Sequence, residues 1–387
     1  IYFFKVYKNK LIKNKVIVLK VAIITINDNN NYGNRLQNYA LQQYLCNKFN
    51  IEKVDTIWHD LEYTCTSKVK VFTWKTWIKY FINWKNIRVY LKKDYYKDII
   101  RMYNIGKFTN KISTNFDFKI KENLNNEYDY FIVGSDQVWN PIFWSKKDNH
   151  ANIRFLKFAS KEKRIAYAAS IAIPEIPKDK EKFFKDSLNE MKAISMREKA
   201  GAELIKKLTG REVSVVVDPT ILLSKEEWQK IELKPEWYSG EKYILTYFLG
   251  NPSPVIEKIA KKNNWKIYNL MDKNNFNLYT SRVEEFIYLI SHAQLVATDS
   301  FHASVFSILM NTPFLVVNRQ EIGMVNMTSR IDTLMELFGY QDRYIVNGKC
   351  NLSENEILHM DFSNVKSIQE REEKFSEEYM KKALNLK

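Results

Sequence analysis

The chain has 387 residues, which is enough for two domains and long for a single ordinary core. Hydrophobic residues make up 45% and charged residues 27% of the sequence, a balance that is typical of globular proteins and excludes a disordered chain. The 60 Lys and Arg residues against 45 Asp and Glu residues give a net charge of +15, which favours an anionic partner such as a phosphorylated small molecule, an acidic membrane surface or a nucleic acid.

The cysteines, the metal-binding residue types and the N-terminus narrow the class further. Cys46, Cys65 and Cys350 form no CxxC motif and no pairing pattern, so we expect reduced thiols in a cytoplasmic protein. No cluster has metal-ligand spacing, and we predict no metal. No apolar run approaches the roughly 18 residues of a membrane-spanning helix. Residues 1–19 lack the features of a signal peptide and are treated as a leader of uncertain extent.

Short apolar runs that alternate with helical patterns predict parallel βαβ units. The predicted strands are residues 21–26, 130–133, 164–169, 213–217, 243–249, 265–270, 295–297 and 314–317. The predicted helices are residues 36–45, 182–191, 199–208, 255–262, 283–290 and 329–338. This order of elements indicates an α/β fold.

A polar break at residues 224–241, which contains Pro235 and Gly240, divides these units into two halves. We therefore expect two Rossmann-like domains that face one another across a cleft, an arrangement that resembles the glycosyltransferase-B architecture. The expected domains are residues 20–225 and 240–364, followed by a helix at residues 365–387 that packs across both.

The first half contains an insertion at residues 68–108 that is dense in Lys, Arg, Trp and Tyr at helical spacing. One interpretation is a basic aromatic helix pair on an anionic membrane, which would give peripheral contact with the inner face of the membrane. The other is a solvated helical hairpin whose aromatic side chains pack on the first domain. No nucleic-acid recognition module accompanies the charge, so we expect no nucleic-acid partner.

The strand at 295–297 ends in Thr298-Asp299-Ser300, and His302 follows at the start of a predicted helix. Ligands bind at the carboxyl ends of strands in open α/β sheets, where helix N–H groups point outward. An imidazole at this position is a candidate acid, base or anion ligand, and the alternative is a capped structural histidine. Asp299 and Ser300 are candidate binding residues for the same reason.

The first predicted strand leads into a polar loop with Asn31, Gly33, Asn34 and Gln37. Gly33 permits close approach of the backbone, while Asn31 and Asn34 can cap the helix and donate to an oxyanion. The alternative is a capped turn without a ligand. These four residues are candidate substrate-binding residues.

The strand at 130–133 delivers Gly134-Ser135-Asp136-Gln137 to its carboxyl end. Asp136 is a candidate to orient a substrate hydroxyl or to accept its proton, and Gly134, Ser135 and Gln137 are candidate binding residues. The nearby Trp139 suits either stacking on a sugar ring or packing in the domain core.

Arg197 follows another short strand and can bind a carboxylate or phosphate through two parallel hydrogen bonds. The alternative is a salt bridge to Glu198 or Asp218. The segment Val217-Asp218-Pro219-Thr220, after the strand at 213–217, is interpreted as a structural turn.

These segments together resemble the polysaccharide pyruvyl transferase family. The resemblance rests on NNYGNRLQNYALQ, YFIVGSDQVWNP, RIAYAASIA, ISMREKAG, VVVDPTILL and TDSFHASVFSI in that order. SRIDTLMELFGYQDR, residues 329–343, is similar to a late segment of the family, and the resemblance covers residues 21–345.

The resemblance implies transfer of the pyruvyl group of phosphoenolpyruvate to two hydroxyls of a sugar as a ketal, with release of phosphate. The implied acceptor is a bacterial surface polysaccharide or its lipid-linked precursor, and no cofactor is implied. His302 would be the acid or an anion-stabilising donor, Arg197 a clamp for the carboxylate or phosphate, and Asp136 a hydroxyl base.

One position departs from the family pattern. Many members carry Arg-Leu-His where this chain has Ser300-Phe301-His302, so a phosphate-binding charge is missing at this point. Either the Ser300 hydroxyl and the helix N-terminus suffice, or Arg330 or another cation substitutes. The alternatives to a pyruvyl transferase are a nucleotide-sugar-dependent glycosyltransferase and a non-catalytic glycan-binding relative. The first is disfavoured because the second half of this chain has no Glu-x7-Glu signature.

Overall fold

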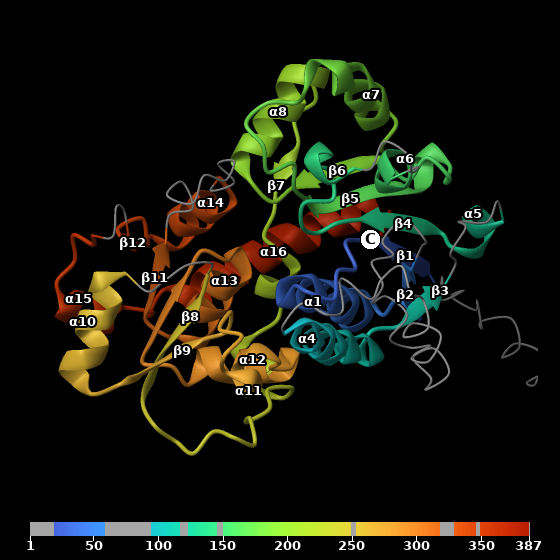
Figure 1. Ribbon diagram of the computed structural model, residues 1–387. Helices are drawn as coiled ribbons and strands as arrows, with labels where there is room; N and C mark the ends of the chain where they lie inside the picture. The colour runs from blue at the N-terminus through green and yellow to red at the C-terminus, as the bar shows by residue number, and fades with distance from the viewer. Residues whose placement is uncertain are drawn as a thin grey trace, which may run out of the picture.

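Two parallel sheets organise the chain (Figure 1). The computed structural model describes residues 19–58, 94–116, 123–144, 150–248, 253–317, 329–345 and 349–386. The strands of the first sheet are β1 (Lys20–Ile24), β2 (Lys53–Trp58), β3 (Thr114–Phe116), β4 (Tyr130–Val133), β5 (Arg164–Ala169), β6 (Ala193–Met196) and β7 (Ser214–Val215). Those of the second are β8 (Tyr243–Tyr247), β9 (Lys266–Asn269), β10 (Leu295–Thr298), β11 (Phe314–Val317) and β12 (Tyr344–Ile345).

The strand order identifies both sheets as doubly wound. Within the described residues the orders are β3-β2-β1-β4-β5-β6-β7 and β12-β11-β10-β8-β9, and all neighbours are parallel. The direction of winding reverses between β1 and β4 in the first sheet and between β8 and β10 in the second, which are the points where such sheets bind ligands. The predicted fold class, an α/β protein with two Rossmann-like domains, is confirmed.

Helices cover the sheets and connect them. They are α1 (Tyr32–Phe49), α4 (Tyr95–Lys107), α5 (Leu124–Glu127), α6 (His150–Arg154), α7 (Lys178–Asn189), α8 (Lys199–Thr209), α9 (Lys225–Gln229), α10 (Pro254–Asn263), α11 (Phe276–Tyr279), α12 (Val283–Ser291), α13 (Phe301–Met310), α14 (Ser329–Phe338), α15 (Glu354–Leu358) and α16 (Val365–Ala383). Short 3-10 turns are η5 (Phe108–Lys111), η6 (Pro141–Phe143), η7 (Lys161–Lys163) and η8 (Pro219–Leu222). In the described residues, no helix is sufficiently long and apolar to cross a membrane.

The apolar strands form because both faces of each sheet are covered. All six residues of β5 and all four of β10 are buried, which matches the near-continuous apolar runs expected for parallel sheets. The predicted strands at 130–133, 164–169 and 314–317 and the helix at 329–338 have the bounds that the sequence predicted. Strands β2, β3 and β12 were not predicted.

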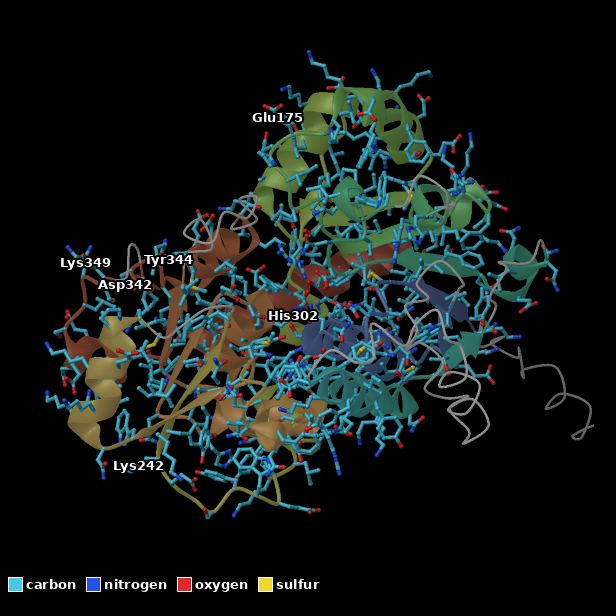
Figure 2. All side chains as sticks on the ribbon, in the orientation of Figure 1. Glu175, Lys242, His302, Asp342, Tyr344 and Lys349 are labelled. Carbon is cyan, nitrogen blue, oxygen red and sulfur yellow. The ribbon has the colours of Figure 1, made fainter. Side chains whose placement is uncertain are left out.

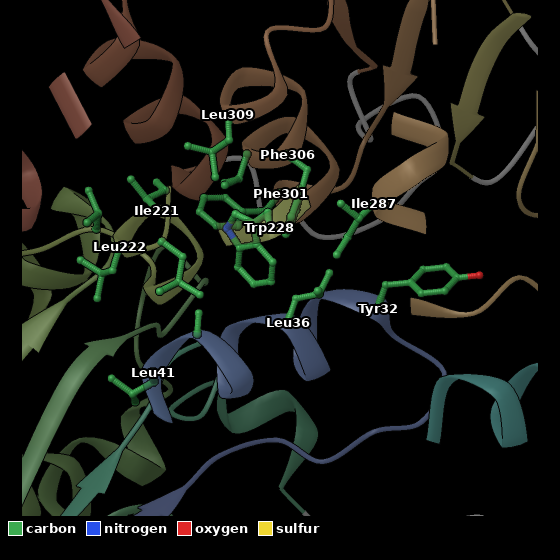
Figure 3. Packing of buried hydrophobic residues seen from close by; sticks show 14 of the residues in the cluster. Tyr32, Leu36, Leu41, Ile221, Leu222, Trp228, Ile287, Phe301, Phe306 and Leu309 are labelled. Atoms are coloured by element: carbon green, nitrogen blue, oxygen red, sulfur yellow. The ribbon is translucent and has the colours of Figure 1, made fainter. Parts of the chain in front are cut away.

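One hydrophobic core lies between the two domains, where α1 faces η8, α12 and α13 (Figure 3). Trp228 is fully buried there, packs edge-on against Phe306 with ring centroids 4.8 Å apart, and donates from Nε1 to the Thr220 carbonyl. It belongs to α9, which begins with a capping box between Ser224 and Glu227. The segment predicted only as a polar linker thus contributes a large side chain to the core.

The C-terminal helix α16 runs between the two domains (Figure 1). Gln369 donates from Nε2 to the carbonyls of Ile221 and Leu223 at 2.7 and 2.8 Å, and Tyr379 donates to the Ala166 carbonyl at 2.6 Å. The helix therefore ties η8 to the first sheet.

The insertion predicted at 68–108 is described only from residue 94 onward, and residues 68–93 lie outside the described part. Helix α4 reaches the second domain, where Asn104 donates to the Thr280 carbonyl and Tyr96 stacks on Phe276. The interpretation that the aromatic side chains of this helix pack on the first domain is therefore wrong for Tyr96, because its ring partner belongs to α11 of the second domain.

Candidate functional site

The carboxyl ends of four strands from the first sheet and one from the second meet between the two domains. The segments that follow β1, β4, β6 and β7 supply Gly33, Asp136, Arg197 and Asp218, and the first turn of α13, which follows β10, supplies His302. Figure 2 shows His302 where the two domains meet. This is the edge at which doubly wound sheets bind ligands.

His302 lies in the first turn of α13 and packs directly against the first turn of α1. A Cβ atom on residue 33 would lie 2.0 Å from Nδ1 and 2.4 Å from Cγ of His302, so only glycine leaves room for the ring. His302 is 5% exposed, and its Nε2 atom is 3.6 Å from Oδ2 of Asp218. The predicted close approach at Gly33 is therefore made by a side chain of the other domain.

Arg197 is fixed by two carboxylates. Its Nη1 atom is 2.7 Å from Oδ2 of Asp218, its Nη2 atom is 3.1 Å from Oδ1 of Asp136, and its guanidinium lies 4.4 Å from the centre of the Phe301 ring. Of the two salt-bridge partners considered from the sequence, the structure shows Asp218. Glu198 instead accepts hydrogen bonds from Ser170 and from backbone N–H groups.

Asp136 is a buried carboxylate between two arginines. Burial works to raise the pKa of Asp136, but the charges of Arg197, His302 and Arg330 outweigh it and lower that pKa. Nη1 of Arg330 lies 3.5 Å from Oδ1 of Asp136. Asp136 is therefore ionised and holds the two guanidinium groups side by side.

Asp218 is the central residue that the sequence interpretation missed. Oδ1 accepts hydrogen bonds from the backbone N–H and the hydroxyl of Thr220 at 3.0 and 2.7 Å. Oδ2 accepts hydrogen bonds from Arg197 and, at 2.9 Å, from the Ser135 hydroxyl. Burial opposes ionisation, yet His302, Arg197 and the Thr220 N–H lower the pKa of Asp218. An aspartate three residues after the end of a strand of the first sheet was the signal that could have found it, as it did for Asp136.

The loop after β4 is held by internal hydrogen bonds. Gly134 has φ +128° and would place a Cβ atom 2.1 Å from the Tyr167 carbonyl oxygen, so its role is conformational. The Ser135 N–H donates to Oε1 of Gln37 at 3.0 Å, and Gln37 donates to the Thr25 hydroxyl at 2.8 Å. The hydrogen bonds of Ser135 and Gln37 therefore hold the loop that carries Asp136 in place.

Other candidate residues fall into three groups. Asn31 and Ser300 are N-caps of α1 and α13 and accept hydrogen bonds from the N–H groups of Gly33 and Ala303. The Gln137 oxygen, with its amide turned toward Arg330, accepts from both guanidinium nitrogens at 3.2 Å. Asp299 and Asn34 are buried next to the cluster formed by Asp136, Arg197, Asp218, His302 and Arg330. Oδ1 of Asn34 has no hydrogen-bond partner within the described residues.

A cavity of about 300 Å³ adjoins the cluster on the α14 side, a size that suits a small ligand. Its walls include Arg197, Asp218, Phe301, Arg330 and Leu334. A larger cavity of about 420 Å³ is lined by α1, α9 and α16 and includes no residue of the cluster, so we place the site at the smaller one.

In the described part of the chain, no three His, Cys, Asp or Glu side chains are arranged to hold a metal ion. The cluster of Asp136, Arg197, Asp218, His302 and Arg330 combines two guanidinium groups, two carboxylates and one imidazole, and the buried Glu198 carboxylate also acts on the charge of Arg197. The arrangement offers a proton donor or acceptor next to cations that are already in place.

Comparison with known proteins adds a family. Residues 31–321 match the family model for polysaccharide pyruvyl transferase. No curated protein sequence matches the chain significantly. This segment includes Gly33, Asp136, Arg197, Asp218 and His302, whereas Arg330 lies beyond it.

Among solved structures, the chain is similar to UDP-GlcNAc 2-epimerase of Methanocaldococcus jannaschii in complex with UDP-GlcNAc and UDP. The identity is 12% and the TM-score 0.39, over 91% of this chain and 99% of that chain. It is also similar to ADP-heptose lipopolysaccharide heptosyltransferase II of E. coli, with 10% identity and a TM-score of 0.35 over 93% of this chain and 100% of that chain.

Proposed function

Because the chain belongs to the polysaccharide pyruvyl transferase family, and is thus a transferase, we propose that it moves the pyruvyl group of phosphoenolpyruvate onto a sugar of a bacterial surface polysaccharide or its lipid-linked precursor. One observation supports this most strongly: His302 of the second domain lies against buried arginine and aspartate side chains of the first. A proton donor beside fixed cations suits a donor substrate that carries both a phosphate and a carboxylate.

In the proposed reaction, His302 gives a proton to C3 of the enol, and positive character develops at C2. A sugar hydroxyl forms a bond to C2, the bond between C2 and the phosphate oxygen breaks, and a second hydroxyl of the same sugar completes the ketal. The first hydroxyl proton returns to His302, and the second leaves with the phosphate. These steps balance without a cofactor.

We assign the cationic side chains to the donor. Arg197 and Arg330 can bind the carboxylate and phosphate of phosphoenolpyruvate through paired N–H groups. The lowered pKa of Asp136 makes it a weak proton acceptor, so we assign it to fixing the two arginines in place of the role of hydroxyl base. Ser300 is occupied as a helix cap, which leaves Arg330 as the cation that substitutes at this end of the site.

A lipid-linked acceptor would place the reaction at the inner face of the membrane. The basic and aromatic composition of residues 68–93 supports this, as do Tyr96 and Tyr103 of α4, which are exposed next to Lys97 and Lys107. We expect the protein to co-sediment with anionic vesicles at low salt, and absence of binding there would reject the membrane role.

The decisive experiment incubates the protein with phosphoenolpyruvate and candidate sugar acceptors and measures phosphate release together with ketal formation. We expect release that depends on the acceptor. Turnover of a nucleotide-sugar instead would identify a glycosyltransferase, and glycan binding without any turnover would identify a non-catalytic relative. Either result contradicts the proposal.

A further inference from the structure

Asp218 uses its two carboxylate oxygens for different purposes. Oδ1 is held by the N–H and hydroxyl groups of Thr220, the residue two positions further in the same turn. This contact fixes the carboxylate plane from its own backbone. Oδ2 therefore points into the cluster, where it accepts from Arg197 and Ser135 and faces His302.

The partners of Oδ2 come from different parts of the molecule. Arg197 follows β6 and Ser135 follows β4, so both belong to the first sheet, whereas His302 follows β10 of the second. Turn η8, which Asp218 caps, itself contacts α1, α13 and α16. The carboxylate of Asp218 thus lies at the junction between the two domains, at the carboxyl ends of the strands.

Charged groups surround the His302 imidazole at this junction. They are the carboxylates of Asp218 and Asp136 and the guanidinium groups of Arg197 and Arg330, and the buried Glu198 carboxylate adds a negative charge beside Arg197. The N-terminal end of α1 at Gly33 adds partial positive charge, which opposes a protonated ring. Against it, the Asp218 carboxylate at 3.6 Å becomes an ion-pair partner when the imidazole is protonated.

We propose that Asp218 is a positioning residue that holds His302 beside Arg197 across the domain boundary and is the ion-pair partner of the imidazole when it carries a proton. The catalytic consequence rests on the proposed function, in which His302 protonates the enol. When it carries a proton, the imidazole adds a positive charge to the two guanidinium groups that meet the anionic donor. The Asp218 carboxylate would thus fix the position of both Arg197 and the imidazole.

The first test is the pH dependence of kcat in Asp218→Asn, which keeps the shape of the side chain and removes its charge. We expect kcat to fall about 10-fold to 100-fold. We also expect the basic limb of the kcat profile to move to lower pH by about one pH unit, because a carboxylate near the imidazole favours its acid form. Asp218→Glu retains the charge and should keep the limb closer to that of the wild type. An unmoved limb in Asp218→Asn would overturn the proposal.

The second test needs no turnover, so its result does not depend on the proposed reaction. Urea unfolding of the wild type, Asp218→Asn, His302→Gln and the double variant gives the coupling between the two side chains. We expect the coupling to be about tenfold in the unfolding equilibrium constant at pH 6 and absent at pH 9. A coupling that is absent at both pH values, or equal at both, would show that Asp218 is only structural.

Asp55→Asn is the matched control. Asp55 of β2 is also a buried carboxylate, and it accepts hydrogen bonds from the Ser113 and Tyr128 hydroxyls at 2.6 and 2.7 Å. The Asp55→Asn variant should have a lower free energy of unfolding than the wild type. The basic limb of its kcat profile should stay in place, and its effect on stability should not be coupled to that of His302→Gln. If the wild type fails to transfer pyruvate while the pH-dependent coupling is found, the proposed function is wrong and the role of Asp218 stands. Transfer without coupling would show the reverse, a pyruvyl transferase in which Asp218 is only structural.

Discussion

Two buried arginines of the first domain lie where the domains meet, and their partners differ. Arg101 of α4 donates to the carbonyls of Leu270 and Tyr279, and its guanidinium lies between the rings of Tyr32 and Tyr279 at 4.8 and 4.9 Å. Arg197 instead meets the carboxylates of Asp136 and Asp218. Both side chains are almost fully buried, so the difference lies in their partners.

The partners decide what each arginine can do. Burial works against the charge of Arg101, but the neighbouring tyrosines Tyr32 and Tyr247 outweigh it and raise the pKa of Arg101. Its carbonyl partners would be left unsatisfied if it moved. Arg197 has charged partners of its own and can share its guanidinium with an incoming carboxylate or phosphate. We conclude that the contacts of Arg101 hold the two domains together, whereas Arg197 and its carboxylates belong to the candidate site.

The sharpest way to break this comparison is to neutralise each arginine in turn. Arg197→Met leaves two buried carboxylates without their partner, and we expect it to lower the free energy of unfolding by about 3–5 kcal/mol and to abolish measurable transfer. Arg101→Met breaks hydrogen bonds and ring contacts without stranding a carboxylate, so we expect about 2–3 kcal/mol. Its kcat should stay within about threefold of the wild type.

Urea unfolding and steady-state kinetics measure both effects for this pair. Equal losses of activity in folded Arg101→Met and Arg197→Met would show that the two contacts do not differ in function.

The pH dependence of stability tests the same carboxylates. The folded-state pKa values of Asp136 and Asp218 are lowered, burial being outweighed by the neighbouring cations. Their contribution is therefore present above the unfolded value of about 3.9 and is lost as the pH falls below it toward the folded values. We expect the stability gap between the wild type and Asp218→Asn in urea to narrow between pH 5 and pH 3. Parallel curves over this range would contradict the lowered values.

Removing the imidazole should be the largest purely catalytic effect. We expect His302→Ala to lower kcat by at least about 100-fold, because an acid that donates a proton in the transition state contributes on that scale. The matched control is His359→Ala, since His359 is exposed at the end of α15 and takes no part in the cluster. Unchanged turnover in a folded His302→Ala protein would return His302 to a structural role.

Gly33→Ala probes the contact between α1 and His302 from the opposite domain. The added methyl group would overlap the imidazole ring, so we expect the ring to shift and kcat to fall about 10-fold. The double variant with His302→Ala shows whether the added methyl group acts through the imidazole ring or in another way. If Gly33→Ala acts through the ring, it should cost no further activity once the ring is gone. An additive loss would mean that the methyl group disturbs something else.

The sequence predicted the parts of the fold whose signals are local. Strand β5 was predicted with its bounds because Arg164 is followed by an uninterrupted apolar run, residues 165–169. Strand β2 was missed because Lys53 and Asp55 interrupt its pattern. Asp55 pairs with Lys53 at 3.1 Å and also accepts hydrogen bonds from Ser113 and Tyr128, 58 and 73 positions away, which no local pattern reveals.

The same distinction applies to the candidate site. His302, Arg197 and Asp136 were found because each follows a predicted strand and the carboxyl edge of a sheet collects ligands. Asp218 follows a strand too, but Pro219 directly after it indicates a structural turn, which explains the residue without a ligand. The sequence offers Asp218 only as an alternative salt-bridge partner of Arg197, and the hydrogen bond from Ser135, 83 positions away, appears only in three dimensions.

Ser300 gives the smallest effect and separates a helix cap from a binding residue. Its hydroxyl accepts from the Ala303 N–H at 3.4 Å, so Ser300→Ala should lower the free energy of unfolding by about 1 kcal/mol. If Arg330 carries the charge that binds the donor, Ser300→Ala should leave KM for phosphoenolpyruvate unchanged, while Arg330→Met raises it about 10-fold. Ser300→Asp keeps a capping group and adds a negative charge, and it should retain stability while weakening donor binding. A raised KM in Ser300→Ala with normal stability would instead assign the hydroxyl to the substrate, and the charged contact would then extend into the cap of α13.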